Sequence, residues 1–352
     1  MESQIKYIHQ LLVTKKVTCT ELVQERLDLL KKNTYNSVNS LLDSLALELA
    51  AKVDAKIANG EEIGLLEGIP FGIKDVYMVQ GTYTTASSEL LKNYKAAYTA
   101  TAIQKLLDAG AIPLVKENCD SFGHGSSSEN TIFGAVKNAI NPELVAGGSS
   151  GGSAVNVAKE YTVFSIGGDT GGSIRQPAGY NHIYGLKPTY GRISRYGIMA
   201  YASSTDCVGP LAKSIEDIRI VLNVMSGKDI KDQTTYTSEE IKEEAILNNN
   251  TVKTVGYFKN FIRIHIMSNF NYVEILNPTT NHTKVVADHS DQHFFEGYTQ
   301  LVRYVPNHEV DIFEQDAVAE EDYLRHLAES ADTEVDTSED HFESTDDVYH
   351  DH

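Results

Sequence analysis

The sequence is poor in cysteine and has no long apolar segment. It contains three cysteines among 352 residues, an odd number of widely spaced thiols, which indicates reduced cysteines rather than a disulfide framework. No apolar run approaches the ~18–20 residues of a membrane helix. The first residues, MESQIKYIHQLLVTKK, lack the basic start, apolar core and cleavage site of a secretory signal. We therefore expect a protein of the cytoplasm or of an organellar matrix, without a membrane partner.

Basic residues are also scarce. The chain has 30 Lys and Arg against 49 Asp and Glu, which gives a net charge of −19. Residues 311–352 contain sixteen acidic residues and one basic residue, Arg325, so most of the negative charge lies there. A segment this acidic, with few large apolar side chains, predicts a disordered tail that repels nucleic acid.

The rest of the chain shows an α/β pattern. We predict helices at residues 18–32, 38–58 and 101–109, and a further helix that Ser214 and Asp217 cap. Residues 111–115, AIPLV, form a predicted strand. Helices that alternate with short apolar strands favour a layered sheet with helices on both sides.

Two glycine-serine clusters are the most informative feature. GGSSGGS at 147–153 and GGDTGGS at 167–173 flank an apolar stretch, which a flexible Gly-Ser linker would not contain. Gly147, Ser149 and Gly151 also fit the nucleophile elbow G-x-S-x-G, but that motif needs a preceding strand, and NPELVA is a poor strand sequence. The elbow would also leave the second cluster unexplained.

The second cluster suits attack on an amide. An amide carbonyl is a poor electrophile, so its cleavage needs an activated nucleophile, a proton acceptor and donors for the oxyanion. The side chain of Ser173 can attack while the backbone N–H groups of Thr170, Gly171, Gly172 and Ser173 face the developing charge. Lys74 lies in the apolar run IPFGIKDV, and burial lowers a lysine pKa enough for it to act as a base.

The separations of these residues, 75 from Lys74 to Ser149 and 24 from Ser149 to Ser173, resemble those of the amidase signature family. Its members cleave carboxamides with a Ser, cis-Ser, Lys triad. The resemblance implies that Ser173 is the nucleophile, that Ser149 follows a cis peptide bond and relays a proton, and that Lys74 is the base. It implies a mixed sheet flanked by helices, incomplete at the C-terminal end.

Residues 116–138 and 184–229 resemble one branch of this family, the A subunits of tRNA-dependent amidotransferases. That resemblance implies hydrolysis of glutamine to supply ammonia for converting Glu-tRNA(Gln) to Gln-tRNA(Gln). It further implies B and C subunits as partners, with ATP and Mg used by the partner and no cofactor bound by this chain. By the same resemblance, His124, Gly125 and Ser126 contribute to the substrate pocket.

The chain departs from the family pattern at several positions. DSFGHG places Ser121 where a glutamate is usual and His124 where a methionine lines the acyl pocket, and Asn181 and His182 stand near the nucleophile in a normally small, apolar stretch. His124 either alters amide preference or is a hydrogen-bonded structural residue. The resemblance predicts an amidase domain at 1–260, an unassigned, β-rich segment at 261–310 and the acidic tail at 311–352.

Two other functions stay open: a stand-alone hydrolase of small amides, and a truncated, weakly active or inactive relative with a binding role. Asp169 and Arg175, beside the nucleophile, are predicted to pair and fix the loop, and Cys119 is predicted to be a packed thiol. His289 and His293 are spaced i, i+4 without a third ligand, so a solvated surface is favoured and no metal site is expected.

Overall fold

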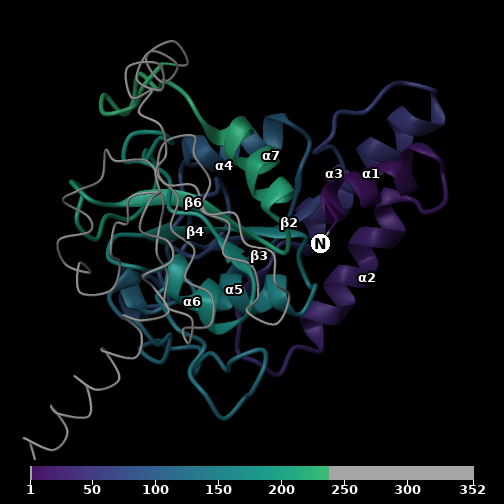
Figure 1. Ribbon diagram of the computed structural model, residues 1–352. Helices are drawn as coiled ribbons and strands as arrows, with labels where there is room; N and C mark the ends of the chain where they lie inside the picture. The colour runs from purple at the N-terminus through teal and green to yellow at the C-terminus, as the bar shows by residue number, and fades with distance from the viewer. Residues whose placement is uncertain (1, 238–352) are drawn as a thin grey trace, which may run out of the picture. The chain divides into compact units, whose positions relative to one another are not determined.

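In the computed structural model, which describes residues 2–237, one mixed six-stranded sheet runs through the centre of this region (Figure 1). Its strands, in the order in which they lie side by side, are β1 (Val38–Leu41), β3 (Ile112–Glu117), β2 (Pro70–Lys74), β4 (Phe164–Asp169), β6 (Cys207–Ala212) and β5 (Tyr184–Gly185). The central strands β3, β2 and β4 are parallel, whereas β1, β6 and β5 pair antiparallel with their neighbours. This arrangement confirms the predicted layered α/β fold.

Helices cover both faces of the sheet. They are α1 (Gln4–Val13), α2 (Cys19–Lys31), α3 (Asp43–Ala58), α4 (Thr101–Asp108), α5 (Gly151–Ala158), α6 (Arg175–Tyr180) and α7 (Ile215–Met225), with short 3-10 turns η1 (Glu89–Leu91) and η2 (Ser121–Gly123). Figure 1 shows α4 and α7 on one side of the sheet and α5 and α6 on the other. The largest apolar cluster joins α1–α4 and α7 to the strands, and a smaller one joins α5 and α6 to Leu211 of β6.

Two of the four predicted helices begin with the side-chain caps that the sequence predicts. Thr18 caps α2 in a capping box with Glu21, as predicted. Ser214 accepts from the backbone N–H of Asp217 at the start of α7. Helix α4 occupies the predicted range 101–109 within one residue, and Gly110 follows with a φ of 81°.

The helix predicted at 38–58 is wrong at its start. Residues Val38–Leu41 form strand β1, and the helix begins only at Asp43. Val38 and Leu41 lie opposite Glu117 and Val115 of β3, so backbone pairing with a strand distant in the sequence determines the conformation. A local apolar pattern cannot report such a partner.

The parallel pairing of β2 and β4 prepares the site. Both strands are buried along their whole length, and Phe71 stacks on its register partner Phe164 with ring centroids 5.1 Å apart. Parallel strands end at the same edge of a sheet, so Lys74 at the end of β2 and Asp169 at the end of β4 point into one region. Helix α5, which begins within the first glycine-serine cluster at Gly151, packs on these strands.

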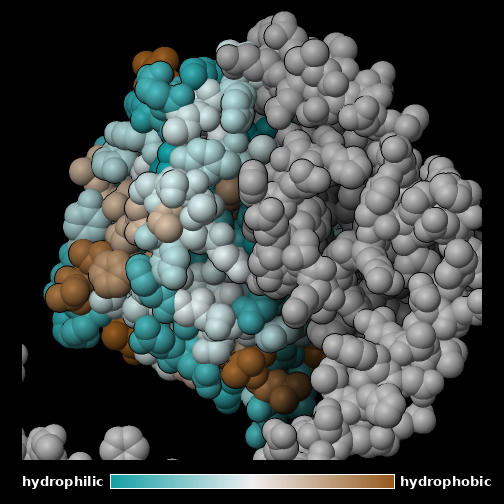
Figure 2. Space-filling view, turned by 60° about the vertical axis from the view of Figure 1, so that its left-hand side comes forward, coloured by the Kyte–Doolittle hydropathy of each residue, from teal (hydrophilic) through white to brown (hydrophobic). Residues whose placement is uncertain are grey.

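The described surface is mainly hydrophilic. Figure 2 shows hydrophobic side chains in separate small areas on one face, and exposed apolar residues such as Leu90 and Ile230 are scattered along the chain. No helix among residues 2–237 is long and apolar enough to cross a membrane. The segments 261–310 and 311–352, with His289 and His293, lie outside the described residues.

Candidate active site

Lys74 is the buried centre of the site. Its side chain, with 2% of the residue exposed, reaches Ser149, and Nζ lies 2.6 Å from Ser149 Oγ and 3.4 Å from the carbonyl oxygen of Gly168. Burial lowers the Lys74 pKa from its ordinary value of 10.5, while nearby acidic groups, Cys119 and Asp120 first, act in the opposite direction. The amine therefore gives up its proton more readily than an exposed lysine, as predicted.

Ser149 follows a cis peptide bond, between Gly148 and Ser149, and is itself buried. Gly148 is required there, since a Cβ would lie 2.2 Å from Asp120 Oδ2. The Asp120 carboxylate accepts from the backbone N–H of Ser128 at 2.9 Å, and the Ser128 hydroxyl donates to the Gly147 carbonyl at 2.9 Å. No strand leads into Ser149 in the described chain, so this segment is not a nucleophile elbow.

Ser173 lies in the turn between β4 and α6, partly exposed, and its carbonyl oxygen accepts from the backbone N–H of Ser150 at 3.1 Å. This bond ties the two glycine-serine clusters together beside Ser149. Of the four expected oxyanion donors, the N–H of Gly172 already donates to Asp169 Oδ1 at 2.8 Å. Those of Thr170, Gly171 and Ser173 donate to no described residue.

Asp169 and Arg175 form the predicted pair. The guanidinium donates through two nitrogens to the two carboxylate oxygens, at 3.0 and 2.9 Å, and both residues are buried. Asp169 also accepts from the N–H groups of Ile174 and Arg175. Burial alone would raise the Asp169 pKa, but Arg175 and these N–H groups hold it below its ordinary value. The pair fixes the turn that carries Ser173.

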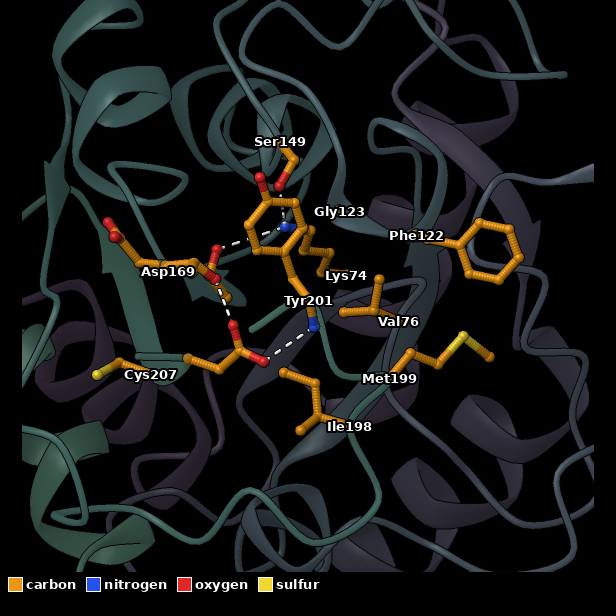
Figure 3. A pocket seen from close by; sticks show the side chains of 13 residues that line it. Lys74, Val76, Phe122, Gly123, Ser149, Asp169, Ile198, Met199, Tyr201 and Cys207 are labelled. Atoms are coloured by element: carbon orange, nitrogen blue, oxygen red, sulfur yellow. Dashed lines mark hydrogen bonds between the residues drawn. The ribbon is translucent and has the colours of Figure 1, made fainter. Parts of the chain in front are cut away.

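A pocket opens above Lys74 and Ser149 (Figure 3). Its lining comes from five segments of the chain: Lys74 and Val76; Phe122 and Gly123; Ser149; Gly168, Asp169 and Thr170; and Ile198, Met199, Tyr201, Asp206 and Cys207. Asp206 joins two of these parts, since it accepts from the Thr170 hydroxyl at 2.5 Å and from the Tyr201 backbone N–H at 2.9 Å. The Thr170 hydroxyl is thereby held against the pocket wall.

Sequence reasoning missed the wall formed by residues 198–207. The segment AYASSTDCVGP belongs to the stretch that resembles the family branch, but it contains no motif that marks a pocket residue. The one acidic residue of this segment, Asp206, could have indicated the pocket wall. A carboxylate that directly precedes a buried strand needs hydrogen-bond donors around it.

The residues of the DSFGHG segment lie at the rim of the pocket. His124, Gly125 and Ser126 are exposed and lie outside the pocket lining, whereas their neighbour Gly123 belongs to it. The His124 ring contacts the ring of Tyr201, and its Nδ1 lies 3.1 Å from the Phe122 carbonyl oxygen. A Cβ on Gly125 would lie 2.2 Å from Asp120 Cγ, so this glycine is needed for packing.

The other departures are accommodated by hydrogen bonds. The Ser121 hydroxyl donates to the Ser87 carbonyl at 2.8 Å. The buried Asn181 amide donates to the carbonyls of Ala146 and Pro177 and accepts from the N–H of Ala139. Asn181 thus holds the segment before Ser149 against the end of α6.

Cys119 is completely buried, and burial raises its pKa to about 11, which fits the predicted packed thiol. Among residues 2–237, no three His, Cys, Asp or Glu side chains are grouped to hold a metal ion.

Comparison with known proteins identifies the class. The amidase family matches residues 18–282, and the chain belongs to that family.

Among its curated relatives, the A subunit of the glutamyl-tRNA(Gln) amidotransferase from Trichormus variabilis is 48% identical over 239 residues, which cover 67% of this chain and 49% of the relative. The protein of the same name from Heliobacterium modesticaldum is 49% identical over 231 residues, or 65% of this chain and 47% of the relative. The chain therefore spans about half the length of the curated relatives that it matches.

Solved structures agree on the fold. A chain from a vestigial complex linked to the origins of an s-triazine catabolic enzyme is 30% identical with a TM-score of 0.66, and the match covers 72% of this chain and 56% of that one. The native peptide amidase from Stenotrophomonas maltophilia is 31% identical with a TM-score of 0.61, over 66% of this chain and 50% of that one.

Proposed function

We propose that this chain carries the amide-cleaving centre of a glutamine-hydrolysing A subunit of a tRNA-dependent amidotransferase. The observation that carries the proposal is the buried contact of 2.6 Å between Lys74 Nζ and Ser149 Oγ, with Ser173 tied beside it through the N–H of Ser150. The identity of about 48% to A subunits of the glutamyl-tRNA(Gln) amidotransferase supports the choice of substrate.

In the proposed reaction the Ser173 hydroxyl oxygen attacks the carboxamide carbon. Its proton passes to Ser149 Oγ, while the Ser149 proton passes to the neutral amine of Lys74. The free N–H groups of Thr170, Gly171 and Ser173 receive the oxyanion. Gly172 is left out of this set because its N–H is held by Asp169.

Collapse of the tetrahedral intermediate breaks the C–N bond. The Lys74 ammonium returns a proton through Ser149 to the leaving nitrogen, which departs as ammonia and leaves an ester on Ser173. Water then attacks the ester by the same relay and releases the acid. The B subunit would receive the ammonia and use ATP and Mg to activate the misacylated tRNA, and the C subunit would brace the pair, with no cofactor on this chain.

The test is ammonia release from glutamine by the purified chain, alone and with B and C subunits, ATP and Glu-tRNA(Gln). We expect Ser173→Ala to abolish release and Lys74→Ala to reduce it by orders of magnitude. Ser44→Ala, an exposed serine of α3, is the matched control and should be unaffected. Release that persists in Ser173→Ala would refute the proposed nucleophile.

The same assay separates the other functions. Ser173-dependent cleavage of simple amides, but not of glutamine, would identify a stand-alone amide hydrolase. A folded chain that cleaves no amide, with or without the B and C subunits, would indicate a relative with a binding role.

A further inference from the structure

Two rings meet at the mouth of the pocket. The centroids of His124 and Tyr201 lie 4.2 Å apart, with the ring planes inclined by 57°. Both residues are exposed, so the contact forms at the solvent side of the site. Inclined ring planes are a common arrangement of aromatic side chains in contact.

The contact joins opposite walls. His124 directly follows Phe122 and Gly123, which line the pocket next to Ser149, and a Cβ on Gly123 would lie 3.7 Å from Ser149 Oγ. Tyr201 belongs to the other wall, with Asp206 and Cys207. In Figure 3 the Tyr201 ring projects across the pocket over Lys74 and toward Ser149 and Gly123.

The backbones behind both rings are held in place. The Tyr201 N–H donates to Asp206 Oδ2, and the Asp120 carboxylate, just before His124, accepts from the N–H groups of Ser128 and Asn130 at 2.9 and 3.3 Å. Exposed side chains change rotamer rapidly, whereas anchored loops do not. The rings can therefore separate by side-chain rotation while the walls stay fixed.

From this geometry we propose that His124 and Tyr201 form a gate that selects amides by the width of their acyl group. In this proposal the amide reaches Lys74 and Ser149 by passing between the two rings. Acyl groups that are slender and unbranched next to the carboxamide, such as that of glutamine, pass with a small displacement, whereas groups that are branched or aromatic at this point require the rings to separate fully. The proposal that the gate selects amides rests on the proposed function. The proposal that the two rings close the pocket does not depend on it.

Cys207 offers a test that needs no catalysis. Cys207 lines the pocket and is 4% exposed as a residue, whereas Cys19 and Cys119 are completely buried. We would measure alkylation of Cys207 by iodoacetamide and by the wider N-phenylmaleimide, with Cys207→Ser to identify the labelled thiol. We expect Tyr201→Ala and His124→Ala to raise the rate with N-phenylmaleimide about tenfold relative to iodoacetamide, the order of discrimination that pocket width achieves. Tyr201→Phe, which keeps the ring, should behave as the unchanged protein.

Tyr98→Ala is the matched control. Tyr98 contacts Tyr196 with centroids 5.1 Å apart, and neither ring lines the pocket, so its loss should leave both alkylation rates unchanged. If the two gate variants keep the ratio of the unchanged protein, or if Tyr201→Phe changes it as much as Tyr201→Ala, the gate is refuted.

Amide turnover gives the second readout. Both alanine variants should raise kcat/KM for a branched or aromatic primary amide about tenfold relative to glutamine or propionamide. Faster alkylation in a protein that cleaves no amide would support the gate and refute the proposed function. Faster alkylation with an unchanged ratio of kcat/KM values would restrict the gate to pocket access and refute its role in selection.

Discussion

Glu117 should make the stability of the fold depend on pH. It is the last residue of β3 and is completely buried. One carboxyl oxygen accepts from Asn156 Nδ2 at 3.0 Å and from Ser165 Oγ at 2.7 Å, whereas Oε2 has no partner within the described structure. Burial raises the Glu117 pKa from 4.5 to about 7, against the opposing effect of the nearby polar side chains of Ser153, Ser165 and Asn156.

The sign follows from proton binding. Between pH 4.5 and about 7 the folded state keeps a proton on Glu117 that the unfolded state has released. The stabilisation is therefore complete below pH 4.5 and is lost as the pH rises through about 7. At 1.36 kcal/mol per pH unit, the whole loss is roughly 3 kcal/mol, of which about 2.5 falls between pH 5 and 8.

Glu117→Gln isolates this effect, because glutamine has the shape of the protonated acid and does not titrate. We expect the free energy of unfolding in urea, measured at pH 5, 6, 7 and 8, to rise for the variant relative to the unchanged protein by about 2.5 kcal/mol across this range. Glu62→Gln removes an exposed carboxylate and should give a curve parallel to that of the unchanged protein. Parallel curves for Glu117→Gln as well would refute the reasoning.

Two further predictions concern stability. Lys116→Met removes the partner of the buried Asp75, whose Oδ1 lies 2.7 Å from Lys116 Nζ. The variant should lower the free energy of unfolding in urea by about 3–5 kcal/mol, and adding Asp75→Asn should recover part of this loss. A loss below about 1 kcal/mol would contradict the prediction. Gly152→Ala places a Cβ 2.4 Å from the Asn118 carbonyl oxygen and should lower the free energy of unfolding by about 1–3 kcal/mol. The Cβ of Gly171→Ala meets nothing within 4 Å, so this variant should leave the urea midpoint unchanged. Equal midpoints for the two variants would refute the assigned packing.

Much of the fold could be predicted wherever local bonds determine the structure. The capping box of Thr18 and Glu21 and the cap at Ser214 involve residues three positions apart, so the sequence itself presents both partners. The separation of 75 residues between Lys74 and Ser149 also predicted that these side chains act together, because it is part of a spacing pattern that the amidase family shares. In the structure the two side chains are in contact. Asp169 and Arg175 were paired correctly for the same local reason.

What could not be predicted depends on partners far apart in the chain. Strand β1 exists because β3 lies beside it, and no pattern within residues 38–41 points to β3. Asp217 illustrates the same limit: besides standing in the first turn of α7, it accepts from the Ser3 hydroxyl at 2.5 Å and from two backbone N–H groups at the start of α1. The meeting of His124 with Tyr201 is a third case, since only the folded chain brings these rings together.

The two buried lysines next to the site differ in the groups that contact their amines. Lys74 and Lys116 lie on neighbouring strands and are both almost fully buried. Lys116 Nζ lies 2.7 Å from Asp75 Oδ1 and is the counter-ion of this buried carboxylate. Lys74 faces a hydroxyl and a carbonyl, and loss of its proton leaves only neutral groups in direct contact. Of the two, Lys74 has the surroundings that fit the proposed proton relay, whereas Lys116 balances the charge of Asp75.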